Sequence, residues 1–153
     1  MNTSTPPNFT PFFRKFGFLR HIGPLWHKPE GRGVVVGLRV GEVHVNPMHT
    51  LHGGMMATLC DVAMAENAAY YAGADQFFVT IGLDAQFIAP AREGAWVEAR
   101  ATPTRITKST AFMSARLTEG ETVLMVANGI FRAPGKMSPE DIARLREGRD
   151  EAP

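Results

Sequence analysis

One segment, NPMHTLHGGMMATLCDVAMAENAAYYAG at residues 46–73, limits the possible folds more than any other. Residues 55–72 are rich in Ala, Met and Leu and predict a helix of about 18 residues, or roughly 27 Å, which Gly73 is suited to end. The helix is apolar nearly all round, yet Asp61 lies in its middle. Burying an unpaired carboxylate is costly, so Asp61 is either held by a neighbour such as Thr58 or used in chemistry.

Segments rich in β-branched residues lie on both sides of this helix. They cover residues 34–45 before it and residues 77–90, 94–106, 110–118 and 122–131 after it. The last two are separated by a short Gly-containing connection of hairpin length, and Pro103 should mark an edge or a bulge. The order predicts an α+β fold, a long central helix wrapped by a curved antiparallel sheet. Because such a sheet has unpaired edges, we expect at least a dimer.

The two ends of the chain predict short helices outside this unit. Residues 12–25 have apolar side chains spaced like one face of a helix, which we expect to lie on the core. Near the other end, Ser138 and Pro139 precede two acidic residues, a pattern typical of a helix start. We therefore divide the chain into an N-terminal extension at 1–32, a main domain at 33–133 and a C-terminal tail at 134–153.

Composition narrows the classes of partner. The 153 residues carry a formal charge of +1, which gives no electrostatic footprint for nucleic acid or an anionic membrane. The single cysteine, Cys60, excludes an intramolecular disulfide and fits a reducing compartment. Prolines and basic residues interrupt the N-terminal apolar run, and the most apolar stretch, residues 55–65, is too short to cross a bilayer. We expect a cytoplasmic protein that binds neither membrane nor nucleic acid.

Gly53 and Gly54 fall where the long helix begins. The first N–H groups of a helix have no partner inside it and favour negative charge, so this turn resembles an oxyanion site in outline. The alternative is that the two glycines only permit a sharp turn from strand to helix.

Three histidines, His44, His49 and His52, are close enough in sequence to suggest a metal site. A closed zinc site needs a fourth ligand, and Cys60 has no partner at a suitable spacing. We therefore expect no metal. His52 should brace the turn, the other two histidines should lie at the surface or an interface, and Cys60 should be a packing residue.

Taken together, these motifs resemble a known family. The pattern N-x-x-x-x-x-H-G-G at 46–54, Asp61 seven residues later, TIGLDAQFIAPA at 80–91 and VANGIF at 126–131 are similar to those of the PaaI-like hotdog-fold acyl-CoA thioesterases. The likeness covers about residues 33–133. It implies a hotdog fold, hydrolysis of acyl-CoA at a dimer interface, and hotdog dimers paired into a homotetramer. No cofactor is implied, because CoA is part of the substrate.

The resemblance also implies roles for individual residues. Asp61 would be the general base or nucleophile, and the N–H of Gly53, with Gly54 beside it, would bind the oxyanion. Asn46 would help to hold the thioester or the water, Thr80 would assist that water from the partner chain, and His52 would act by position. Many relatives carry glycine where this chain has His49, a departure that bears on the backbone path of the loop and on the shape of the acyl pocket.

CoA recognition and the acyl group are less constrained. The resemblance places CoA near Arg92, Arg105, Lys108 and Lys136. The candidates to line the acyl pocket are Phe77, Phe78, Phe87, Met55, Met56 and the N-terminal aromatic residues, which could equally be core. Such a pocket could accept aryl or medium aliphatic groups. An acyl-CoA-binding protein without activity is the main alternative. A dehydratase is less well matched, because the chain has no histidine after His52. A structural protein would not need the glycines, Asp61 and Thr80 together.

Overall fold

The computed structural model describes residues 5–12, 17–73, 77–135 and 137–147. Its strands are β1 (Thr10–Phe12), β2 (Leu25–Glu30), β3 (Gly33–Arg39), β4 (Val79–Phe87), β5 (Trp96–Ile106), β6 (Thr110–Glu119) and β7 (Thr122–Arg132). Its helices are α1 (Phe18–His21), the 3₁₀ turn η1 (Glu42–His44), α2 (Gly53–Ala72) and α3 (Pro139–Glu147). Of the helices within these residues, none combines the length and apolar character that a membrane span requires.

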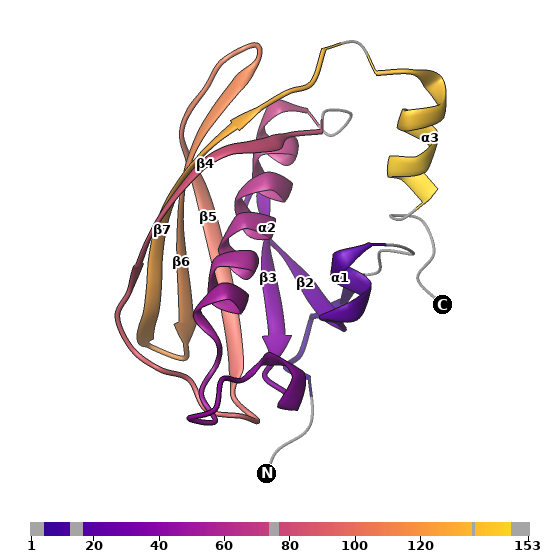
Figure 1. Ribbon diagram of the computed structural model, residues 1–153. Helices are drawn as coiled ribbons and strands as arrows, with labels where there is room; N and C mark the ends of the chain where they lie inside the picture. Colours follow the sequence, from indigo (N-terminus) through magenta and orange to yellow (C-terminus); the bar gives the residue numbers. More distant parts are fainter. Residues whose placement is uncertain (1–4, 13–16, 74–76, 136, 148–153) are drawn as a thin grey trace.

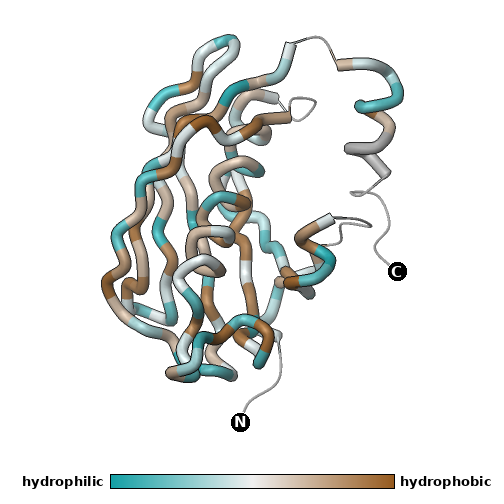
Figure 2. The backbone as a smooth tube through the Cα atoms, viewed as in Figure 1, coloured by the Kyte–Doolittle hydropathy of each residue, from teal (hydrophilic) through white to brown (hydrophobic). Residues whose placement is uncertain are grey.

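The strands form one antiparallel sheet in the order β1-β2-β3-β5-β6-β7-β4. The sheet curves around α2, which lies along its inner face (Figure 1). Side chains alternate between this face and the outer one, so buried and more exposed residues alternate along β5 and β6. Figure 2 shows the hydropathy of the residues along these strands. The central helix in a curved antiparallel sheet confirms the predicted hotdog fold.

Helix α2 forms close to the predicted bounds. It starts two residues earlier than expected, at Gly53, and ends before Gly73, whose φ of 98° is the left-handed geometry that suits glycine. Its inward face buries Met56, Leu59 and Met64 against β3, β5 and β6.

The N-terminal prediction was wrong. The helix expected over residues 12–25 is reduced to the four residues of α1, and it lies between two strands that the sequence did not predict. Leu25 on β2 is buried opposite Leu38 on β3, and Phe9 packs edge-on against Trp96. Cross-strand packing and backbone pairing outweigh a short helix, which is marginal by itself. Phe13 and Phe16, two residues of the expected helix, lie outside the described residues.

The strand expected over residues 34–45 ends earlier, at Arg39. A 3₁₀ turn follows, and His44 holds it because Nδ1 accepts the Gly41 N–H at 2.8 Å. The other ring nitrogen is 2.9 Å from the carbonyl oxygen of Ile22, which it contacts as donor. His44 is buried within the chain and both its ring nitrogens are bonded there, so the prediction of a surface or interface histidine was wrong.

The later strands agree better with the sequence. The register of β5 and β6 shifts between Pro103 and Arg105, which confirms the predicted bulge. The connection between β6 and β7 turns at Gly120, where φ is 55°. At the start of α3, the Ser138 hydroxyl accepts the N–H of Asp141 at 3.1 Å, as the cap prediction requires.

Candidate functional site

The first turn of α2 leaves one backbone donor available. His52 is the N-cap, and its Nδ1 accepts the N–H of Gly54 at 2.9 Å, so the neutral ring carries its proton on Nε2. The N–H of Gly53 donates to none of the residues that the structure describes. A Cβ at Gly53 would lie 3.2 Å from the Phe87 ring, so glycine allows this close approach. An incoming oxygen can therefore reach the Gly53 N–H at a helix start.

The loop before α2 is organised by Asn46. Its Oδ1 accepts the N–H of Met48 at 2.9 Å, the N–H of Thr50 at 3.3 Å and the Thr50 hydroxyl at 3.1 Å. His49 has a φ of 55°, the left-handed geometry that a glycine would adopt easily. The histidine therefore follows the backbone path available to glycine, and the amide nitrogen of Asn46 is left for other contacts.

Asp61 is bonded to a residue far away in sequence. The Thr80 hydroxyl donates to Asp61 Oδ1 at 2.7 Å, and both side chains reach solvent. Thr58, the alternative partner, donates instead to the carbonyl oxygen of Gly54 at 2.9 Å. Asp61 is thus a partly exposed carboxylate with one oxygen bonded to Thr80. The suggestion that Thr58 is its hydrogen-bond partner was wrong.

A bulge in β4 turns Thr80 toward the helix. Gly82 pairs with Ile130 of β7, and the next pair is Thr80 with Phe131, so Ile81 is the extra residue. In a regular ladder, Ile81 would oppose the buried Phe131 on the inner face, and Thr80 would point outward. Because of the bulge, Thr80 points to the inner face and Ile81 points outward, where the residue is 59% exposed.

Asp61 and Thr80 therefore come from the same chain. The sequence predicted that Thr80 assists the water from the partner chain, whereas in this structure its hydroxyl contacts Asp61 of its own chain. Gly53 and Asp61 are eight residues apart on α2, which puts them about 12 Å apart along the axis. One carbonyl group cannot contact both within a single subunit.

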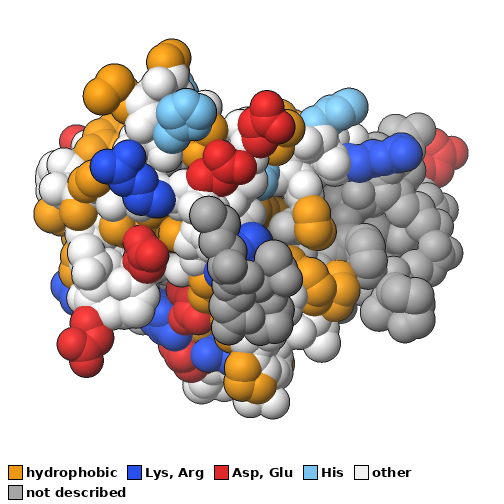
Figure 3. All heavy atoms as spheres, turned by 90° about the horizontal axis from the view of Figure 1, so that it is seen from below, with side chains coloured by type: hydrophobic (Ala, Val, Ile, Leu, Met, Phe, Trp, Pro, Cys, Tyr) orange, Lys and Arg blue, Asp and Glu red, His pale blue; other side chains and the backbone are white. Residues whose placement is uncertain are grey.

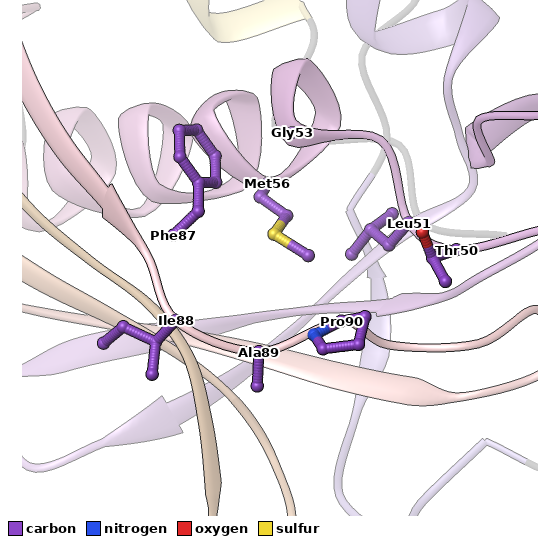
Figure 4. A pocket seen from close by; sticks show the side chains of 8 residues that line it. All are labelled: Thr50, Leu51, Gly53, Met56, Phe87, Ile88, Ala89 and Pro90. Atoms are coloured by element: carbon purple, nitrogen blue, oxygen red, sulfur yellow. The ribbon is translucent and has the colours of Figure 1, made fainter. Parts of the chain in front are cut away.

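An apolar pocket of about 300 Å³ borders Gly53. It is lined by Thr50, Leu51, Gly53, Met56, Phe87, Ile88, Ala89 and Pro90 (Figure 4). Met56 projects from α2 toward the segment that follows β4, and Phe87 lies against the helix beside it (Figure 4). The sequence suggested Met56 and Phe87 as possible lining residues but missed the 88–90 segment, which carries no polar signal.

The structure does not bring the predicted CoA-binding cations together. Arg92 is exposed and bridges to Thr50 through the backbone, near the start of α2. Arg105 and Lys108 are exposed at the opposite end of the sheet, where β5 turns into β6 (Figure 1). The face that contains the start of α2 carries acidic and basic side chains interspersed (Figure 3). Lys136 lies outside the described residues.

The three histidines and Cys60 were the remaining candidates for chemistry. His44 has both ring nitrogens engaged, His52 caps the helix, and His49 is exposed. In the described part of the chain, no three potential metal ligands come together. Cys60 is buried as predicted, and burial, then the charge of Asp61, raises the pKa of its thiol to about 12, so it stays protonated.

Comparison with known proteins connects this geometry to a family. The sequence profile of the thioesterase superfamily matches residues 48–126, which span the helix start, Asp61 and Thr80. The chain belongs to the thioesterase superfamily. A Pseudomonas aeruginosa protein named as an esterase, PA0474, is 36% identical over 132 residues, which cover 86% of this chain and 98% of that protein.

Solved structures share the fold of this chain. The Escherichia coli PaaI protein of the phenylacetic acid degradation operon aligns with a TM-score of 0.64 at 19% identity, covering 71% of this chain and 77% of PaaI. The Bacillus halodurans protein BH2602, solved with CoA, aligns with a TM-score of 0.60 at 25% identity, covering 65% and 66%. The predicted membership of a thioesterase family is confirmed, and the chain is a thioester hydrolase. The likeness to PaaI confirms the predicted fold.

Proposed function

We propose that this thioesterase hydrolyses acyl-CoA to the free acid and CoA, with Asp61 as general base or nucleophile. The observation that carries the proposal is the Thr80–Asp61 contact of 2.7 Å on an accessible face of α2. The Thr80 hydroxyl bonds to one oxygen of the Asp61 carboxylate and leaves the other able to take a proton. The CoA bound to BH2602 supports CoA as the carrier.

The reaction follows from the chemistry of the two groups. Water attacks the thioester carbonyl carbon while Asp61 takes its proton, and negative charge develops on the carbonyl oxygen. The Gly53 N–H, aligned with the helix dipole, stabilises that charge. The C–S bond then breaks, and the CoA thiolate leaves with a proton returned from Asp61. In the nucleophilic variant, the carboxylate attacks the carbonyl carbon first, the C–S bond breaks and the CoA thiolate leaves. Water then hydrolyses the mixed anhydride, which releases the acid, restores the Asp61 carboxylate and supplies the proton that the thiolate takes up.

A complete site requires two subunits in this proposal. Gly53 and Asp61 are about 12 Å apart along α2, so the base must meet the oxyanion donor of another copy. The outer edge of β4 exposes Val79, Ile81 and Leu83, an apolar edge that a second copy could pair with. Asn46 and His52 would then belong to the oxyanion half of the site, and Asp61 and Thr80 to the base half. The homotetramer and the cytoplasmic location stay predictions from the sequence.

Subunit mixing tests this arrangement. Chains carrying Asp61→Asn, mixed with chains carrying Asn46→Ala, should recover hydrolysis of an acyl-CoA, because one site per mixed dimer keeps both halves intact. Chains carrying Asp61→Asn, mixed with Thr80→Ala chains, should show no such recovery, because both residues belong to the base half.

Activity is measured as thiol release, after the mixed chains have been unfolded and refolded together. Equal recovery in the two mixtures would contradict the assignment of halves. Absence of thioester hydrolysis by the unaltered protein, with CoA binding retained, would favour an acyl-CoA-binding protein without activity.

A further inference from the structure

We infer that the pocket beside Gly53 binds the acyl chain of the substrate and selects uncharged, apolar acyl groups. The inference rests on the proposed function, because it places the thioester carbonyl at the Gly53 N–H. An acyl chain leaves the carbonyl carbon directly, so it must enter space that borders this N–H. The pocket lined by Met56 and Phe87 is such a space.

The lining offers almost no polar group to a ligand. Thr50 has the only polar side chain, and its hydroxyl is already bonded to Asn46 at 3.1 Å. The backbone N–H of Leu51 donates to Ala91 at 2.8 Å, and those of Ile88 and Ala89 both donate to Leu124. A carboxylate or hydroxyl on the acyl group would therefore lose hydration without replacement, which disfavours polar acyl groups.

The same property assigns the acyl chain, not the pantetheine arm, to this pocket. The arm of CoA carries two amide groups, and burying them here would leave their donors and acceptors without partners. An aliphatic or aryl chain has no such groups. The arm must then leave the carbonyl on the other side, toward solvent.

Two side chains determine the available length. Phe87 is 57% exposed and lies against the first turn of α2 beside Gly53. Met56 is buried and projects across the pocket (Figure 4). The contact between an acyl chain and this lining stops increasing once the pocket of about 300 Å³ is filled.

The test measures binding, so that it does not depend on turnover. In the Asp61→Asn protein, the dissociation constants of a series of straight-chain acyl-CoAs are compared by calorimetry with that of CoA. Each added methylene should tighten binding by about fourfold until the pocket is full. Succinyl-CoA should bind no more tightly than CoA.

Variants of the lining should shift this profile. Met56→Ala removes three heavy atoms and should extend the optimum by about three carbons, whereas Met56→Leu, which keeps the volume, should leave it in place. Phe87→Ala should weaken binding of the best chain by about tenfold, because it loses the ring contact. Phe112→Ala, on the outer face of the sheet, is the matched control and should change nothing.

The outcomes separate the two proposals. Binding that is independent of chain length, or a profile that Phe87→Ala leaves unchanged, would overturn the acyl assignment even if the protein hydrolyses thioesters. A second copy that fills the pocket would produce the same length-independent result. A length profile with no hydrolysis by the unaltered protein would support the pocket and contradict the proposed function. Thermal melting shows whether each variant is still folded. If Met56→Ala unfolds, Phe87→Ala still tests the proposal, because Phe87 is largely exposed.

Discussion

The two sides of helix α2 differ in how completely the chain covers them. On one side, β3 is buried over Gly33–Leu38, and Asn67 of the helix donates to the Val34 carbonyl at 2.8 Å and accepts its N–H at 3.0 Å. On the other side, β4 exposes most of its residues, and Asp61 has a single bond, from Thr80. The closed side satisfies its own polar groups, whereas the open side leaves a carboxylate and an apolar edge available to a ligand or a second copy.

Removing the charge of Asp61 should have the largest effect. Asp61→Asn keeps the size and the contact with Thr80 but removes the base, so turnover of acyl-CoA should fall by about 10²-fold or more. The melting temperature should change little. Asp84→Asn, which changes an exposed carboxylate on β4, the strand that carries Thr80, is the control and should keep full turnover. Normal turnover in Asp61→Asn would end the assignment of the open side as catalytic.

The closed side should respond in the opposite way. Asn67→Ala leaves the backbone N–H and carbonyl of Val34 buried without partners, so unfolding free energy should fall by about 2 kcal/mol. Turnover per folded protein should stay normal. Chemical denaturation measures the first and thiol release the second. Asn128→Ala, an exposed amide on β7, should stay within about 0.5 kcal/mol of the parent. A fall in turnover per folded protein, with the unfolding free energy unchanged, would contradict the assignment of a purely structural role to the closed side.

The apolar edge gives a smaller but distinct test. Ile81→Lys places a charge on the exposed edge of β4, which should weaken self-association by about tenfold or more if a second copy pairs there. Thr10→Lys puts the same charge on β1, the short strand at the other edge, and should not affect assembly. Light scattering across a dilution series measures both. Equal behaviour of the two variants would remove β4 as the preferred interface.

The sequence predicted the closed core better than the open side. The 55–72 helix and the four later strands follow from strong local patterns, and these patterns agree with the tertiary packing. The β2 strand, LWHKPE, was missed because Pro29 and its mixed polarity hide a strand that depends on pairing with β3. The end of β3 was misplaced because the side-chain bonds of His44, which set the turn, leave no periodic signal.

The sequence proposed residues for the candidate site but not their geometry. Motif spacing identified Gly53, Asp61 and Thr80, and their chemistry suggested what each could do. The pairing of Thr80 with Asp61 in one chain depends on the bulge at Ile81, and a bulge is a property of the register between two strands. The basic residues predicted to bind CoA do not lie together. The sequence around an exposed Arg or Lys does not indicate where its side chain lies on the surface.

The bulge in β4 also makes the site sensitive to chain length. The ladder on both sides of Ile81 has a two-residue repeat, so one residue inserted between Thr80 and Gly82 would turn the Thr80 hydroxyl to the outer face. Asp61, Thr80 and Gly53 would all still be present, and only the spacing within the 80–91 motif would change. In the evolution of such chains, a single codon gained on an edge strand could therefore disable the carboxylate's support without replacing any catalytic residue.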